Sequence, residues 1–192
     1  MKFHFNLCTY TLLLTLLIVM TACGNSYNEE FITSEKTLKQ AKIIAAEFER
    51  SDLQSLSIIG DDIFVINNLV INLKNKTFGF APEGGFYESY FEAAGENTYN
   101  DLSSIKEFLV PNSKTSEFKV LNLLATMKKI GLTDLHHLKA EQVIMLQWGS
   151  SIMHGFNGLI FADSPNIVSE LQAYKFSELK LLDKNTFYFS VR

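Results

Sequence analysis

The sequence predicts an α+β domain in which a mainly antiparallel sheet packs with about four to six helices. Short apolar segments of strand length, separated by turn residues, occur between 56 and 80 and again between 143 and 191, and they predict a meander followed by hairpins. Amphipathic segments with helix-capping residues lie before, between and after these strands. The chain of 192 residues is 47% hydrophobic, which suffices for the core of one domain.

Residues 1–22 have the features of a secretory signal. The positive charge of Lys2 precedes an apolar stretch at 12–20, and small residues follow it. This stretch is too short to cross a bilayer, which takes about 20 apolar residues. We therefore expect a cleaved signal peptide and not a transmembrane helix.

The end of this leader, Met20-Thr21-Ala22-Cys23, resembles the lipobox of bacterial lipoproteins. The resemblance covers only the leader and Cys23. It implies that a peptidase cuts before Cys23, that the thiol carries a diacylglyceryl group, and that the new amino terminus receives a fatty acid such as palmitate. Two or more chains make a stable anchor, because each buried CH₂ adds roughly 0.8 kcal/mol. The alternatives are a soluble secreted protein and an uncleaved leader with a chance cysteine.

This resemblance divides the chain into a signal peptide at 1–22, a lipidated Cys23 with a polar tether at 23–33, and a single domain at 34–192. It implies anchoring to the bacterial cell membrane or outer membrane, with the domain outside the cytoplasm. Cys8 and Cys23 are the only cysteines, so we expect no disulfide in the domain. The formal net charge of −4 and the lack of a basic run argue against a nucleic acid partner. No cofactor is expected.

The first predicted helix begins at Ser34, a suitable N-cap, and ends near Ser51-Asp52. Its apolar residues recur at helical spacing and share one face: Leu38, Ala41, Ile44, Ala45 and Phe48. We expect this face to lie on the sheet.

The strands of the predicted meander are separated by residue types that accept tight turns, at Gly60-Asp61, Asn67-Asn68 and Asn75-Lys76. In the third strand, Leu69, Ile71 and Leu73 alternate with Val70, Asn72 and Lys74. We expect one face of this strand to be buried and the other to be at least partly wet.

Three helices are predicted between 86 and 131. A short aromatic helix spans 86–94 and ends at Gly95, and a second spans 102–109 with Asp101 as its cap. The third opens at Ser116-Glu117 and closes at Gly131, and its apolar face comprises Val120, Leu121, Leu124 and Met127.

The C-terminal third returns to strands. We expect one strand at 143–148, and a hairpin of 152–156 with 159–162 around Asn157-Gly158, the strongest turn signal in the chain. A helix from Ser164-Pro165 to Leu171 follows. A terminal hairpin then pairs 179–182 with 186–191.

Catalytic candidates are few. Ser151 and His154 supply a nucleophile and a base near a predicted turn. Residues three apart on a strand point to opposite faces, and the second glycine of a Gly-x-Ser-x-Gly elbow is missing. The alternative is a polar turn between two strands. The sequence therefore favours a protein that is not an enzyme.

Two further groups are candidates for binding. Tyr87 and Tyr90, after Gly84-Gly85, are candidate ligand contacts in an acidic, aromatic segment. The alternative is core packing by Phe86, Tyr90 and Phe91, which leaves Tyr87 and the nearby glutamates exposed. His136-His137 on a helical turn would lie about 100° apart and would not readily hold one metal ion, so no metal site is expected.

Three functions remain open. The first is a lipid-anchored binding or interaction module of the cell envelope, with a protein or a small molecule as ligand. The second is an envelope inhibitor or immunity-type protein that neutralises a toxin or hydrolase. The third is a hydrolase that uses Ser151 and His154. The first function is favoured by default, because no sequence feature selects either of the other two.

Overall fold

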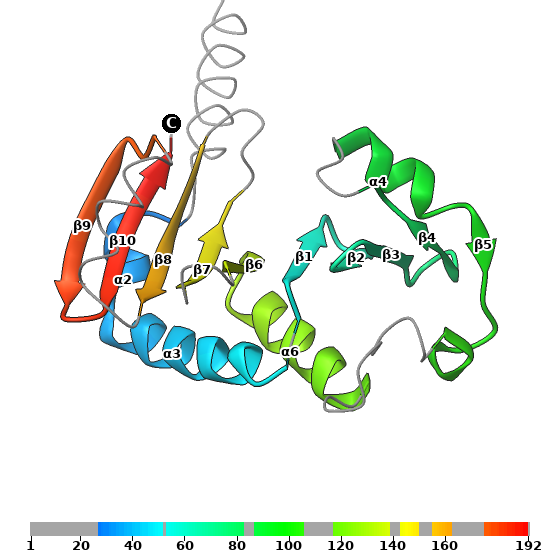
Figure 1. Ribbon diagram of the computed structural model, residues 1–192, viewed down its shortest axis with the longest axis horizontal. Coiled ribbons are helices and arrows are strands. Elements are labelled where there is room, and N and C mark those ends of the chain that lie inside the picture. The colour runs from blue at the N-terminus through cyan, green and yellow to red at the C-terminus, as the bar shows by residue number, and fades with distance from the viewer. Residues whose placement is uncertain are drawn as a thin grey trace, which may run out of the picture.

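The computed structural model describes residues 27–51, 53–82, 87–105, 117–138, 143–149, 155–162 and 175–191 (Figure 1). The leader at 1–22 and Cys23 lie outside these residues, as do Ser151, His154 and the helix expected at 164–171. The described chain is α+β and mainly an antiparallel sheet, which confirms the predicted fold class.

Ten strands form one sheet in the order β5-β4-β3-β2-β1-β6-β7-β8-β10-β9. Every neighbouring pair is antiparallel. The two halves of the sheet join where β1 pairs with β6 and Leu56 lies opposite Leu135. The strands are β1 (Ser55–Ile59), β2 (Ile63–Ile66), β3 (Leu69–Asn72), β4 (Thr77–Phe80), β5 (Asn97–Thr98), β6 (Leu132–Leu138), β7 (Val143–Trp148), β8 (Phe156–Ala162), β9 (Glu178–Asp183) and β10 (Thr186–Val191).

Helices cover both faces of this sheet. The described residues hold four α-helices and one 3₁₀ helix, namely α2 (Glu29–Thr33), α3 (Glu35–Glu49), α4 (Tyr87–Ala93), η1 (Leu102–Ile105) and α6 (Glu117–Lys129). Helices α3 and α6 contact each other and lie along one side of the sheet (Figure 1). Helix α4 packs on β4 from the other side.

The main core lies between the sheet and helices α2, α3 and α6. Its largest fully buried side chains include Trp148, Phe48, Ile32, Ile44, Leu56, Ile66, Leu69, Ile71 and Met127. The indole nitrogen of Trp148 donates a hydrogen bond of 3.0 Å to the carbonyl of Ile130, so this buried donor is satisfied. The other face of the sheet carries two smaller clusters, one under α4 and one over β7, β8 and β10.

Helices α3 and α6 form as predicted. Ser34 caps α3, because its hydroxyl accepts a hydrogen bond from the amide of Thr37. On α3 the predicted apolar face enters the core, with Ala41, Ile44 and Phe48 fully buried. On α6, Val120, Leu124 and Met127 enter the core as predicted, but Leu123 is buried there in place of Leu121, which is half-buried. Gly131 follows α6 with a φ of +71°, the left-handed conformation expected after a helix.

The meander and the terminal hairpin are also confirmed. The turns of the meander contain Gly60, Asn67 and Lys76 in left-handed conformations, at φ values of +64°, +56° and +52°. Asn67 gains further support because its side-chain oxygen accepts hydrogen bonds from the amides of Gln54 and Ser55. Strands β9 and β10 pair as expected around 184–185.

The expectation of a partly wet face on the third strand was wrong for part of β3. Val70 is fully buried on the face opposite Leu69 and Ile71. It packs with Ile63, Val65, Ala81, Ala93 and Ala94 beneath α4. The prediction failed because a helix distant in sequence covers this second face.

The hairpin turn expected at Asn157-Gly158 was wrong, since both residues lie inside β8 opposite Trp148 and Gln147. The Asn157 side chain donates to the carbonyl of Tyr27 and accepts from the hydroxyl of Tyr188. A Cβ at Gly158 would overlap the carbonyl of Leu146 and the ring of Phe189. Tertiary packing therefore holds these two residues in a strand, although their residue types favour a turn in isolation.

The helical reading of His136-His137 was also wrong, because both residues lie in β6. Leu132 and Leu135 are three apart, as on a helix, yet both side chains enter the main core. An irregularity in the pairing between Leu132 and Asp134 makes this possible, since one extra residue brings both leucines to the same face.

The expected tether at 23–33 also required correction. Its second half forms α2, which Asn28 caps by accepting a hydrogen bond of 2.9 Å from the amide of Phe31. Ile32 is fully buried in the main core. The described part of the chain begins at Tyr27, close in sequence to the proposed lipidated residue.

Candidate functional site

The described residues line a groove between α3 and the adjacent strands, with a volume of about 820 Å³. We call it the α3 groove. Residues of α3 form one wall, and the turn between β9 and β10 forms part of the other. Its lining comprises Lys42, Ala45, Ala46, Glu49, His137, Ile144, Phe161, Ala162, Asp183, Lys184, Asn185 and Thr186.

The floor of the α3 groove is mainly apolar. Ile144, Ala162 and Thr186 reach it from three strands and are nearly fully buried. Opposite them, α3 presents Ala45 and Ala46, whose small side chains leave space that larger residues would fill. Two consecutive alanines thus form part of the helix wall of the groove.

The rim of the α3 groove is charged. Lys42 Nζ lies 2.8 Å from Asp183 Oδ2 and joins the helix to the hairpin. This hydrogen bond from Lys42 is the main reason that the pKa of Asp183 falls to about 2, and the amide of Asn185 also contributes. Glu49 and Lys184 add one charge of each sign.

His137 lies on the same wall of the groove as Ile144. Its ring meets that of Phe48 edge to face, with centroids 6.2 Å apart. Its amide donates a 2.7 Å hydrogen bond to the carbonyl of Gln54. The ring therefore packs against Phe48, and His137 adds a polar side chain to the groove lining.

This arrangement is suited to binding. Small-molecule sites typically have volumes of about 300–1,000 Å³, apolar linings and a few fixed polar groups. The α3 groove has all three properties, and its rim could pair with either end of a dipolar ligand.

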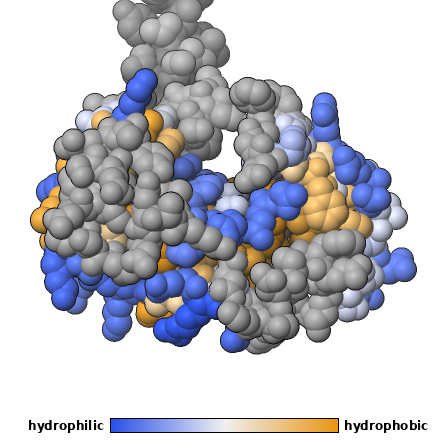
Figure 2. Space-filling model, viewed as in Figure 1, coloured by the Kyte–Doolittle hydropathy of each residue, from blue (hydrophilic) through white to orange (hydrophobic). Residues whose placement is uncertain are grey.

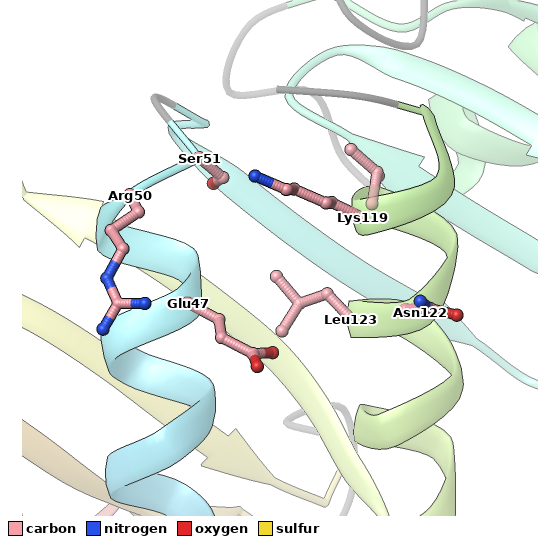
Figure 3. Close-up of a pocket in the computed structure, with 7 residues that line it drawn as sticks. Glu47, Arg50, Ser51, Lys119, Asn122 and Leu123 are labelled. Atoms are coloured by element: carbon pink, nitrogen blue, oxygen red, sulfur yellow. The ribbon is translucent and has the colours of Figure 1, made fainter. Parts of the chain in front are cut away.

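A second, smaller pocket of about 220 Å³ lies between the C-terminal end of α3 and the start of α6. Figure 3 shows Glu47 and Leu123 directed into the space between the helices, and the Lys119 ammonium directed toward Ser51. Arg50 points away from α6 in the same view. The pocket is smaller than typical ligand sites, so we do not assign it a ligand.

A third pocket, of about 210 Å³, is almost entirely apolar. It lies between β2, β3, η1 and α6, and its lining includes Ile71, Leu73, Leu102 and Leu124. Figure 2 shows hydrophobic residues gathered over the meander strands. Leu73 is 39% exposed at its edge.

A polar row crosses the other face of the sheet. Ser57, Asp134 and Gln147 lie directly opposite one another on β1, β6 and β7. Burial raises the pKa of Asp134, and hydrogen bonds from Ser57 and Thr133, together with nearby His136, partly oppose this shift. His136 Nε2 lies 3.9 Å from the Asp134 carboxylate. Sequence analysis missed this row, because the three residues meet only through strand register.

The predicted site residues are placed as follows. Tyr90 is half-buried and packs on the cluster under α4, away from the α3 groove. Tyr87 lies at the start of α4, but its side chain is outside the described part. Phe91, expected as a core residue, is 47% exposed. Cys23, Ser151 and His154 lie outside the described residues.

The described residues contain neither a metal-binding cluster nor a membrane-spanning helix. No group of three or more histidine, cysteine, aspartate or glutamate side chains there is placed to hold a metal ion. No helix in those same ranges has the length and apolar character needed to span a membrane. Comparison of the chain with protein-family models, curated proteins and solved structures gives no match.

Proposed function

We propose that this chain is a lipid-anchored binding module of the bacterial cell envelope, and that its ligand enters the α3 groove. The observation that supports binding is the groove itself, with its volume of about 820 Å³, its apolar floor and its charged rim. The lipobox-like segment that ends at Cys23 supports the anchor.

The anchor and the groove would act together. A domain held at a surface meets a ligand at that surface at a high effective concentration, so that modest affinity suffices. The mixed charges of Lys42, Glu49, Asp183 and Lys184 suit a ligand with an apolar body and a polar end. A segment of a protein partner meets this description, as does a small amphipathic molecule.

The anchor is tested by the intact mass of the protein purified from its bacterial host, compared with the Cys23→Ser variant. We expect the mass of the wild-type chain to equal residues 23–192 plus acyl groups, and the protein to be recovered with membranes. The Cys23→Ser variant should be recovered in the soluble fraction. An unmodified thiol at Cys23 would overturn the anchor.

The groove is tested by photo-crosslinking in the same host. A photoreactive amino acid at Lys184, on the groove wall, should give an adduct, and one at Ile43, which is 51% exposed and outside the groove lining, should not. The substitution Ala46→Phe should remove the adduct by filling the groove. Equal labelling at both positions, or an adduct that survives Ala46→Phe, would exclude the groove as the site.

A further inference from the structure

Tyr27, the first described residue of the chain, lies at a fixed point on the domain. The carbonyl of Tyr27 accepts a 2.9 Å hydrogen bond from Asn157 on β8. Its ring lies against Gly131, where a Cβ would overlap it, and also packs against the main core. Tyr27 is therefore held by β8 and by the turn after α6.

Tyr27 is only four positions after Cys23 in the sequence. A fully extended chain covers at most about 3.5 Å per residue, so the backbone of Cys23 stays within about 14 Å of Tyr27. A domain of this size has a radius of gyration of roughly 15 Å, and its width exceeds this reach. A lipid on Cys23 would therefore bring only the side around Tyr27 to a bilayer.

An exposed aromatic residue lies on this same side. Phe31 on α2 is 37% exposed, and its ring centroid is 5.5 Å from that of Tyr27. Aromatic rings favour the interface between lipid headgroups and acyl chains. Of the two acidic residues on α2, Glu29 is paired with Lys180 at 2.6 Å, which reduces its repulsion from anionic lipid, and Glu30 beside Phe31 is exposed.

We infer that the Tyr27 side of the domain docks on the bilayer surface, and that Phe31 enters the headgroup layer. This inference rests on the proposed lipid at Cys23. The anchor then fixes the orientation of the domain as well as its location, because the tether is shorter than the domain is wide. A partner must approach from a side that the bilayer leaves open.

The test uses the full-length lipidated protein in phosphatidylcholine vesicles whose acyl chains carry bromine near the headgroup, a short-range quencher of tryptophan fluorescence. The reporter variant is Phe31→Trp. The matched control is Phe80→Trp on β4, which is 42% exposed and six strands from β8, or roughly 29 Å at the usual strand spacing. Trp148 is fully buried and contributes the same background to both variants.

We expect bromine to quench the added fluorescence of Phe31→Trp at least twice as strongly as that of Phe80→Trp. Insertion of twelve Gly and Ser residues after Gly24 should lower the quenching of Phe31→Trp to the level of the control, while the protein stays bound. Equal quenching of the two variants, in protein whose mass shows lipid at Cys23, overturns the docking and leaves the anchor standing. Absence of lipid at Cys23 overturns both.

A second reporter covers the case in which Phe31→Trp fails to fold. Glu30 is exposed beside Phe31, and after leader cleavage and lipidation the variant Glu30→Cys offers one free thiol for a nitroxide label. Relaxation of this label by oxygen, which enters lipid, should exceed its relaxation by a water-soluble nickel complex. The ratio should reverse when the spacer is inserted. A label that the nickel complex relaxes more strongly without the spacer contradicts the docking.

Discussion

Lys42 on α3 and Asp183 at the end of β9 form an ion pair of 2.8 Å across 141 residues of sequence. Both residues belong to the rim of the α3 groove. The pair therefore links the helix wall of the groove to its hairpin wall.

This ion pair should contribute modestly to stability, in a pH-dependent way. Its side chains are 52% and 44% exposed, so we expect a coupling of at most about 1 kcal/mol from a double-mutant cycle of Lys42→Met and Asp183→Asn. The pKa of Asp183 is lowered to about 2, so the stabilisation is complete above about pH 4 and is lost as the pH falls through 2. Urea unfolding at pH 7 and pH 2 measures it.

The matched control is the pair of Lys128 and Asp61, which are 3.8 Å apart with Asp61 91% exposed. We expect a coupling close to zero for this pair at both pH values. Equal coupling in the two pairs would show that the groove pair has no special role.

The substitution Gly158→Ala should be strongly destabilising, by about 3 kcal/mol or more, because a Cβ there overlaps a backbone carbonyl and the ring of Phe189. The matched control is Gly95→Ala, where the nearest atom would lie 3.7 Å away and the expected change is within about 0.5 kcal/mol. Thermal unfolding of both variants checks the difference. A mild effect at position 158 would mean that β8 does not pass as close to β7 and β10 as described.

Loss of the Ser34 cap should destabilise the domain by about 1 kcal/mol. Its hydroxyl accepts from the amide of Thr37 at 3.4 Å and donates to the carbonyl of Phe31 at 2.8 Å, so Ser34→Ala removes contacts at the junction of α2 and α3. Thr126→Ala on the exposed side of α6 is the control, because its hydroxyl donates to the carbonyl of Asn122 within the same helix. Chemical denaturation should show a loss for Ser34→Ala well above that for the control.

The variant Asp134→Asn should be more stable than wild type at neutral pH. Its gain over wild type should be larger at neutral pH than at acidic pH. Burial raises the pKa of this carboxyl, so the folded state disfavours its charge, and the native protein loses stability as the pH rises through that pKa. Asparagine keeps an acceptor oxygen for Ser57 and carries no charge. Melting temperatures of Asp134→Asn and wild type at pH 4 and pH 7 test this. A larger gain at pH 4 than at pH 7 would contradict the assignment.

The local features of this fold were predictable from the sequence. The helix cap at Ser34, the left-handed Gly131 and the turns of the meander are local features. Each is formed by residues only a few positions apart in the sequence. The same holds for the apolar face of α3, because helical spacing alone places Ala41, Ile44 and Phe48 together.

The tertiary structure decided what long-range packing controls. Three features depend on packing partners that lie outside the local segment. They are the second buried face of β3, the continuation of β8 through Asn157 and Gly158, and the irregular pairing that puts Leu132 and Leu135 on one face. The α3 groove is of the same kind, because its walls come from segments more than 130 residues apart. Sequence periodicity indicates which residues share a face, but only the assembled sheet determines what lies against that face. The assembled sheet therefore also determines the groove that we propose as the binding site.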